Sequence, residues 1–300
     1  MVSLRAKFFM GIMKRMSMKN EGKMVVEKKR AKLAEDVFLF HVPIRTKVEK
    51  LEVNGISAEW ISRKNQPNDR AIIYLHGGYY VSGSPRTHRS IAARIGKVSN
   101  SPVLLLDYHL APENKFPAAL EDSVSAYSWI LKYKGILPDK VVIVGDSAGG
   151  GLTLATLIKI RSDNEILPAG GVCLSPWTDL AVTGKSVKTN AKIDLLITEN
   201  EAHQAAEYYL GDLDRTNPLA SPLYAKLDGL PPLLIQVGTA EVLLDDSTRF
   251  AKKAQESGVQ VELDLWEGMF HVFQMFGYLM PESKKALVKI GNFIRKVMKE

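Results

Sequence analysis

The distribution of apolar residues predicts an alternation of buried strands and helices from residue 71 onward. Short runs rich in valine, isoleucine and leucine are typical of central strands in a parallel sheet. These runs are residues 71–75, 102–106, 141–144, 170–174, 233–237 and 261–266. Helical patterns separate them at residues 87–98, 117–134, 152–158 and 245–257. Strands that alternate with helices in this way predict crossover units and a mostly parallel sheet, so the fold class is α/β.

Two departures from this alternation predict a hairpin and an insertion. Residues 48–61 alternate apolar and polar side chains around Asn54-Gly55, a strong hairpin signal, so we expect two antiparallel strands first. No strand pattern occurs between residues 175 and 233, where a helix is predicted at 199–210. An insertion at the carboxyl ends of parallel strands is expected to form a lid over the crevice where ligands bind.

The first two dozen residues predict a basic amphipathic helix. Leu4, Phe8, Ile12 and Met16 recur at four-residue spacing, with arginine and lysine between them. The longest uncharged run, residues 8–13, is too short for a secretory signal. The helix either covers an apolar site of the domain with its methionine side or lies on an anionic membrane surface. We favour the cover, because a single basic helix binds membranes only weakly.

Composition and charge narrow the class of protein. A chain of 300 residues with 46% hydrophobic content can bury the core of one large domain or two small ones. The net charge of +7 is concentrated in residues 1–50, which hold 13 of the 40 lysines and arginines but 5 of the 33 acidic residues. The remainder is nearly neutral and contains no nucleic-acid-binding module, so no nucleic acid partner is expected.

The single cysteine and the length of the apolar runs bear on location. Cys173 lies in an apolar run, so we interpret it as a small buried hydrophobic residue, and no internal disulfide can form. No uninterrupted apolar segment is long enough to span a membrane. A soluble, cytoplasmic protein is therefore expected.

The turn after residues 141–144 has the pattern of a nucleophile elbow, Gly145-x-Ser147-x-Gly149. The glycines leave room for a sharp turn that presents the serine at the carboxyl end of a strand. Ser147 would then stand at a helix N-terminus, where free amides favour a developing negative charge. Glycine-rich loops match this pattern by chance, but the strand before it and the helix after it favour a nucleophile.

A serine nucleophile needs a base and a group that orients the base. His271 follows the last predicted strand. Proteins with this elbow carry their triad in the chain order serine, acid, histidine, so the base is expected near this position. The alternative is a histidine buried in the core. Glu241, Asp245 and Asp246 lie in the loop after residues 233–237. Glu241 comes soonest after the strand, whereas the two aspartates suit a helix N-terminus, so we predict Glu241 as the acid.

A glycine pair predicts the donors that would stabilise a negatively charged intermediate. Gly77 and Gly78 follow the strand at residues 71–75, and glycines let backbone amides approach a reacting oxygen. We expect Gly77, Gly78 and Ala148 to form an oxyanion hole. The glycine pair is informative because it accompanies the elbow.

From about residue 70 to the C-terminus, the chain resembles the hormone-sensitive-lipase-like esterases of the α/β-hydrolase fold. The motifs that carry the resemblance are His76-Gly77-Gly78, Gly145-Asp146-Ser147-Ala148-Gly149-Gly150, residues 107–113 and 116–120, and the Glu241 and His271 loops. The resemblance implies ester hydrolysis without a metal or organic cofactor. It also implies an eight-stranded, mostly parallel sheet flanked by helices, with a helical cap from the N-terminal region and a mid-chain insertion.

Three positions depart from the common pattern of this family. Tyr79 stands where many members have a third glycine, which would narrow the acyl side of the site. His109 replaces a usual arginine, at a position that we interpret as structural. Glu241 occupies the place of an aspartate, as it does in part of the family.

These observations together predict a serine carboxylesterase that hydrolyses short- to medium-chain acyl esters of small molecules through an acyl-enzyme. The aromatic residues expected to line the substrate pocket are Tyr79, Tyr80, Trp177, Tyr208 and Phe270. We expect residues 1–45 to form N-terminal cap helices and residues 178–225 a cap insertion. Residues 46–177 and 226–300 are expected to form the α/β-hydrolase core. The resemblance also implies a homodimer, because family members are often dimers.

The sequence leaves three alternatives. The same triad would serve an amide or acyl-sugar deacylase, because these reactions share the acyl-enzyme chemistry. A non-catalytic small-molecule receptor on the same scaffold is disfavoured by His271, since loss of the base usually accompanies such a conversion. An interfacial lipase would use the basic N-terminal helix to dock on lipid.

Overall fold

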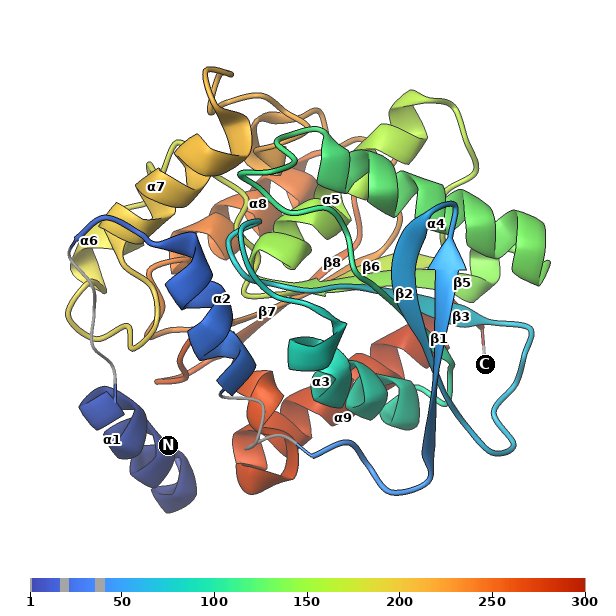
Figure 1. Cartoon of the computed structure of the whole chain (residues 1–300), viewed down its shortest axis with the longest axis horizontal. Helices are drawn as coiled ribbons and strands as arrows, with labels where there is room; N and C mark the ends of the chain where they lie inside the picture. The colour runs from blue at the N-terminus through green and yellow to red at the C-terminus, as the bar shows by residue number, and fades with distance from the viewer. Residues whose placement is uncertain (1, 17–21, 36–40, 300) are drawn as a thin grey trace.

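The computed structural model describes residues 2–16, 22–35 and 41–299. Its core is an eight-stranded sheet in the order β1-β2-β4-β3-β5-β6-β7-β8, which confirms the predicted α/β fold (Figure 1). The strands are β1 (Thr46–Val53), β2 (Ile56–Arg63), β3 (Ala71–Leu75), β4 (Val103–Leu106), β5 (Val141–Asp146), β6 (Gly170–Leu174), β7 (Leu233–Gly238) and β8 (Val261–Trp266). Strand β2 pairs antiparallel with both β1 and β4, and the pairs from β4 through β8 are parallel.

Helices cover both faces of the sheet. In the described part of the chain they are α1 (Leu4–Met16), α2 (Val26–Glu35), α3 (Pro85–Val98), α4 (Ala118–Lys134), α5 (Ala148–Ser162), α6 (Ser186–Thr189), α7 (Glu199–Leu210), α8 (Leu244–Glu256) and α9 (Pro281–Val297). Figure 1 shows α3 and α9 on one side of the sheet and α4, α5 and α8 on the other. Helix α9 is missing from the predictions above, although its buried apolar residues recur at helical spacing.

The central strands are buried on both faces, as the continuous apolar runs indicate. In β3, Ile72 and Tyr74 face the layer of α3 and α9, whereas Ile73 and Leu75 face the layer of α4, α5 and α8. This alternation follows from the two-residue period of a strand. Cys173 of β6 is fully buried in the second layer, which agrees with its interpretation as a small hydrophobic residue.

Helix α1 forms as expected but packs with a different face from the one its spacing suggests. Ala6, Phe9, Met10 and Met13 pack against an apolar cluster of η4 (Phe273–Leu279) and its neighbours. Leu4, Phe8 and Ile12 remain 84%, 65% and 38% exposed, and the side chain of Met16 lies outside the described residues. The helix therefore covers the domain with its methionine side, while Leu4, Phe8 and Ile12 face solvent.

The insertion between β6 and β7 contains α6 and α7, and α7 lies against α2 from the N-terminal region. Lys29 of α2 forms a 2.7 Å ion pair with Glu201 of α7. The amide of Met24 donates to the side chain of Gln204, and the hydroxyl of Tyr208 donates to the Met24 carbonyl. Among the helices of the described residues, none has the length and apolarity that a membrane crossing requires.

Candidate active site

Ser147 occupies the sharp turn between β5 and α5. Its backbone has φ 54° and ψ −121°, a conformation that residues other than glycine rarely adopt. Its amide donates to the carbonyl of Leu174. A Cβ atom at Gly145 would lie 2.1 Å from the Gly149 carbonyl oxygen, and one at Gly149 would lie 2.0 Å from the Leu75 oxygen. The two glycines are therefore required by close backbone approach, as the elbow pattern predicts.

The structure brings Ser147, His271 and Glu241 together from loops that follow three different strands. The Ser147 Oγ lies 2.9 Å from the His271 Nε2, and the His271 Nδ1 lies 2.8 Å from the Glu241 Oε2. A carboxylate can only accept, so Nδ1 carries the proton and Nε2 is left to accept from the serine hydroxyl. This arrangement prepares the hydroxyl for proton transfer to the imidazole.

The second oxygen of Glu241 is held by two donors. Its Oε1 accepts from the Gly238 amide at 2.6 Å and from the Ser175 hydroxyl at 2.8 Å. The Ser175 Oγ in turn accepts from the amide of Val272, next to the histidine, at 3.2 Å. Ser175 thus links the loop that carries Glu241, here called the acid loop, to the loop that carries His271. No motif marks this serine in the sequence, and its position directly after β6 is the one signal that could have identified it.

The two neighbouring aspartates of the acid loop have other partners. Asp245 accepts from the amide of Ser186 at 3.0 Å. Asp246 accepts from the amides of Thr178 and Asp179 at 2.8 and 2.9 Å. Of the three carboxylates that the sequence offers, Glu241 is the one bonded to His271.

The charges of this buried pair favour a protonated imidazole once a proton arrives. Burial lowers the pKa of His271, but the hydrogen bond and negative charge of Glu241 outweigh it and raise that pKa above its ordinary value. The carboxylates of Asp194 and Asp146 act in the same direction. A base with a raised pKa can accept the serine proton and hold it as the transition state forms.

The loop after β3 presents backbone amides beside the serine, but Gly77 has another acceptor. Its amide donates to Asp146 Oδ1 at 3.1 Å, so Gly77 positions the loop. Within the described residues, no hydrogen bond uses the amides of Gly78, Tyr79 or Ala148. Tyr79 adopts φ 61°, a left-handed backbone, at the position where the sequence departs from the common third glycine.

Asp146, next to Ser147, is the anchor of this loop. Besides the Gly77 amide, its Oδ1 accepts from the Tyr74 hydroxyl at 2.8 Å. The Nε2 atom of His88 lies 3.4 Å from its Oδ2. Burial opposes ionisation of Asp146, but His88 and the Tyr74 hydroxyl keep its pKa below the ordinary value. The carboxylate therefore stays charged and holds the loop.

His76, the first residue of the glycine motif, is a structural neighbour of the site. It is fully buried and stacks on Tyr108 with ring centroids 4.2 Å apart. The Tyr108 hydroxyl donates to the His76 carbonyl at 2.6 Å. Burial lowers the pKa of His76 to about 3, so the ring is neutral near neutral pH.

The five predicted pocket aromatics occupy four different places. Tyr80 and Trp177 are buried in the core, where Tyr80 stacks on Tyr209 with ring centroids 3.9 Å apart. Phe270 packs beneath α1 with the apolar cluster of η4. Tyr208 reaches the chain before α2 through Met24. Of the five, Tyr79 alone combines a position in the loop after β3, here called the glycine loop, with contacts to both α2 and α7.

Those contacts form a small polar group over the loop. The Lys29 ammonium lies 4.3 Å from the centroid of the Tyr79 ring, and the Tyr79 hydroxyl donates to Glu201 at 3.3 Å. The Lys29 to Glu201 ion pair closes the group, with the two side chains 23% and 14% exposed. Helices α2 and α7 are thereby joined to the segment that presents the free amides.

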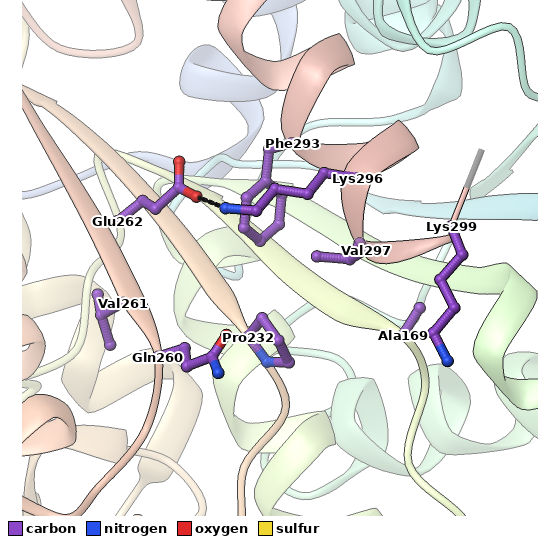
Figure 2. Close-up of a pocket in the computed structure, with 9 residues that line it drawn as sticks. All are labelled: Ala169, Pro232, Gln260, Val261, Glu262, Phe293, Lys296, Val297 and Lys299. Atoms are coloured by element: carbon purple, nitrogen blue, oxygen red, sulfur yellow. Dashed lines mark hydrogen bonds and ion pairs between the residues drawn. The ribbon is translucent and has the colours of Figure 1, made fainter.

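A hollow also lies at the other ends of the parallel strands, away from Ser147, and its lining residues are of other types than those of the candidate site. It has a volume of about 460 Å³ and lies at the amino ends of β6, β7 and β8, near Ala169, Pro232 and Gln260 (Figure 2). Glu262 and Lys296 form a 2.7 Å ion pair there. Its lining contains no serine, cysteine or histidine, so it offers no nucleophile or histidine base. In the described part of the chain, no group of histidine, cysteine and acidic residues is arranged to hold a metal ion.

The known proteins that are similar to this chain are hydrolases with the same fold. Residues 72–275 match the model of a family described as having the alpha/beta hydrolase fold. The chain is 42% identical to an acetyl-hydrolase of Streptomyces hygroscopicus over 81% of each chain. It is 36% identical to an esterase of Acinetobacter venetianus, over 82% of this chain and 81% of the other. The crystal structure of an esterase from the bacterial hormone-sensitive lipase family covers 99% of both chains, with a TM-score of 0.94 and 42% identity.

Proposed function

Because the chain belongs to the hormone-sensitive-lipase-like esterases of the α/β-hydrolase fold and is a carboxylic ester hydrolase, we propose that Ser147, His271 and Glu241 are its catalytic triad. The observation that carries this proposal is the unbroken hydrogen-bond chain from Glu241 through His271 to Ser147. The imidazole lies within hydrogen-bond reach of the hydroxyl, which favours turnover over a receptor that only binds a ligand.

The proposed reaction proceeds through an acyl-enzyme. Ser147 Oγ attacks the ester carbonyl while His271 Nε2 takes its proton, and the charge on Glu241 stabilises the imidazolium. The imidazolium then protonates the leaving alkoxide. In the second half of the reaction, His271 takes a proton from the water that attacks the acyl-enzyme and returns it to Ser147 Oγ as the acid leaves. We assign the oxyanion to the amides of Gly78, Tyr79 and Ala148, with Tyr79 in place of Gly77, because the Gly77 amide already donates to Asp146.

We propose acyl chains of short to medium length. Tyr80 and Trp177 fill the core behind the glycine loop, which supports a short acyl side. The joined helices α2 and α7 contact Tyr79 of this loop, which supports a cap that limits access. A series of nitrophenyl esters tests the assignment. We expect the highest kcat/KM between acetate and octanoate, and a preference for palmitate would contradict it.

The triad itself is tested by comparing Ser147→Ala with wild type and with Ser162→Ala, a matched change at the exposed far end of α5. We expect Ser147→Ala to lower kcat for nitrophenyl butyrate by about 10⁴-fold or more while retaining the wild-type melting temperature. Ser162→Ala should match wild type. A fluorophosphonate should label wild type and Ser162→Ala but leave Ser147→Ala unmodified. Comparable turnover in Ser147→Ala and wild type would refute the assignment.

A further inference from the structure

Helix α1 has apolar residues on two opposite faces, and the fold uses one of them. Ala6, Phe9, Met10 and Met13 pack on the domain. The other face carries Leu4, Phe8 and Ile12, which we call the α1 stripe. These three side chains are exposed, at 84%, 65% and 38%. An exposed leucine alone needs no explanation, but three large apolar side chains aligned on one helix face form a patch of the kind that marks interaction surfaces.

Cations border the α1 stripe. At 100° per residue, Arg5 lies on one side of the stripe, Lys7 and Lys14 on the other, and Arg15 within it. All four side chains are exposed, and no ion pair in the described part of the chain involves them. The helix contains no acidic residue. An apolar stripe flanked by lysine and arginine is the pattern of a helix that lies in the interface of an anionic bilayer.

The helix is already formed and fixed on the domain. The Ser3 hydroxyl accepts the Ala6 amide at 3.1 Å and so caps the first turn. The Ser3 amide and hydroxyl donate to Glu282 at the start of α9 at 2.7 and 2.9 Å. A free peptide must order itself when it binds a membrane, whereas this helix loses little conformational entropy on docking. The weakness expected of an isolated basic helix therefore does not apply in full.

We propose that α1 docks the protein on an anionic lipid surface, with the α1 stripe inserted among the acyl chains and its cations at the headgroups. A second copy of the chain is a poor occupant. Symmetric contact through α1 would place cations against cations, and three side chains bury far less than the roughly 800 Å² per partner of a stable interface. Anionic lipid satisfies both the charge and the small apolar area.

The position of α1 determines which side of the protein would face the bilayer. Helix α1 packs on Met269 and Phe270, directly before His271. Figure 1 places α1 on the same side of the molecule as α2, α6 and α7. A protein held by the α1 stripe would therefore turn its cap side toward the bilayer. The docking itself does not depend on the proposed catalytic triad.

The test is co-sedimentation with vesicles. Wild type is compared on phosphatidylglycerol/phosphatidylcholine vesicles and on pure phosphatidylcholine, beside a stripe variant, Leu4→Ser/Phe8→Ser/Ile12→Ser. The control variant, Tyr133→Ser/Leu137→Ser/Ile166→Ser, removes three exposed hydrophobic side chains from another region, where they are 61%, 64% and 70% exposed. A charge variant, Arg5→Gln/Lys7→Gln/Lys14→Gln/Arg15→Gln, separates the contribution of the cations.

We expect wild type to partition at least about tenfold more strongly into the anionic vesicles, and salt at about 0.5 M to reduce the difference. The stripe and charge variants should each lose about tenfold or more of this binding, and the control variant should behave as wild type. All variants should keep the wild-type circular dichroism spectrum and turnover of soluble nitrophenyl butyrate. Equal binding by wild type and the stripe variant, or no wild-type binding to anionic vesicles, would overturn the proposal. Self-association that the stripe variant abolishes would assign the surface to a second copy instead.

Discussion

Asp194 accepts the backbone amide of Val242, the residue directly after Glu241, through a 2.8 Å hydrogen bond. Its other oxygen accepts the amides of Leu196 and Ile197 at 2.8 and 2.9 Å. Asn190, four residues earlier, donates from its side chain to the carbonyl of Glu241 at 2.8 Å. The insertion between β6 and β7 thus holds the loop that carries the proposed acid, and Asp194 is a positioning residue.

Replacing Asp194 by asparagine tests this role. An amide group cannot accept on both sides, so Asp194→Asn sets an N–H against an N–H in a buried site, at a cost of about 1–3 kcal/mol of unfolding free energy. It also removes a charge that raises the pKa of His271. We expect kcat to fall about tenfold, the acid limb of the pH profile to move to lower pH, and fluorophosphonate labelling of Ser147 to persist at a reduced rate.

The matched control is Asp163→Asn, which changes an aspartate in an exposed pair with Lys159. This variant should stay within about 0.5 kcal/mol of wild type and keep its pH profile. If Asp194→Asn has wild-type kcat and wild-type stability, the insertion does not position the acid.

The pH dependence of kcat/KM tests the coupling between Glu241 and His271. As the proposed base, His271 would work as neutral imidazole, so we expect activity to rise with pH through its pKa, which Glu241 raises. Glu241→Gln removes that charge, so we expect the acid limb to move to lower pH while the plateau falls by about 10³-fold or more. Glu241→Asp keeps the charge and should retain the acid limb near its wild-type position. A limb that stays in place in Glu241→Gln would contradict the assignment.

Asp146 should affect catalysis through the glycine loop. Asp146→Asn weakens its hold on the Gly77 amide and removes the charge beside His88. We expect kcat to fall about tenfold with little change in KM, because the loop amides act most strongly in the transition state. Tyr74→Phe removes another donor to the same carboxylate and leaves the Gly77 bond intact. It should cost about 1 kcal/mol of stability with a smaller effect on kcat.

How far the sequence anticipates this structure depends on which residues carry a signal. Each proposed triad residue follows the carboxyl end of a predicted strand, and parallel strands bring those ends to one edge of a sheet. That topology suffices to expect Ser147, Glu241 and His271 near one another. Ser175 and Asp194 carry no motif, and their roles depend on loops that meet only in the folded chain.

Backbone and packing details account for the other differences. Whether Gly77 or Tyr79 has the free amide depends on the bond from Gly77 to Asp146 and on the left-handed backbone of Tyr79. Neither is visible in a glycine motif. In α1 both faces are apolar, so residue spacing alone could not identify the packed face. The four-residue stripe was the more regular pattern, but Met10 and Met13 make the contacts.

The ion pair between Lys29 and Glu201 should set how firmly α2 and α7, the proposed cap helices, hold the loop of the proposed oxyanion hole. Both side chains are largely buried, and burial lowers the pKa of Lys29 even though Glu201 opposes that shift. Lys29→Met leaves Glu201 without its cation beside Tyr79, and we expect a loss of about 1–2 kcal/mol of unfolding free energy.

A double-mutant cycle measures the coupling. Lys29→Met, Glu201→Gln and the double variant are compared by denaturant unfolding and by KM for nitrophenyl butyrate, with Lys159→Met as an exposed-pair control that should cost about 0.5 kcal/mol or less. Each single change should raise KM several-fold, because the cap then holds the Tyr79 loop less firmly. The double variant should be more stable than the sum of the single effects predicts, since no unpaired charge remains. Strictly additive losses with unchanged KM would show that this ion pair does not couple the cap to the site.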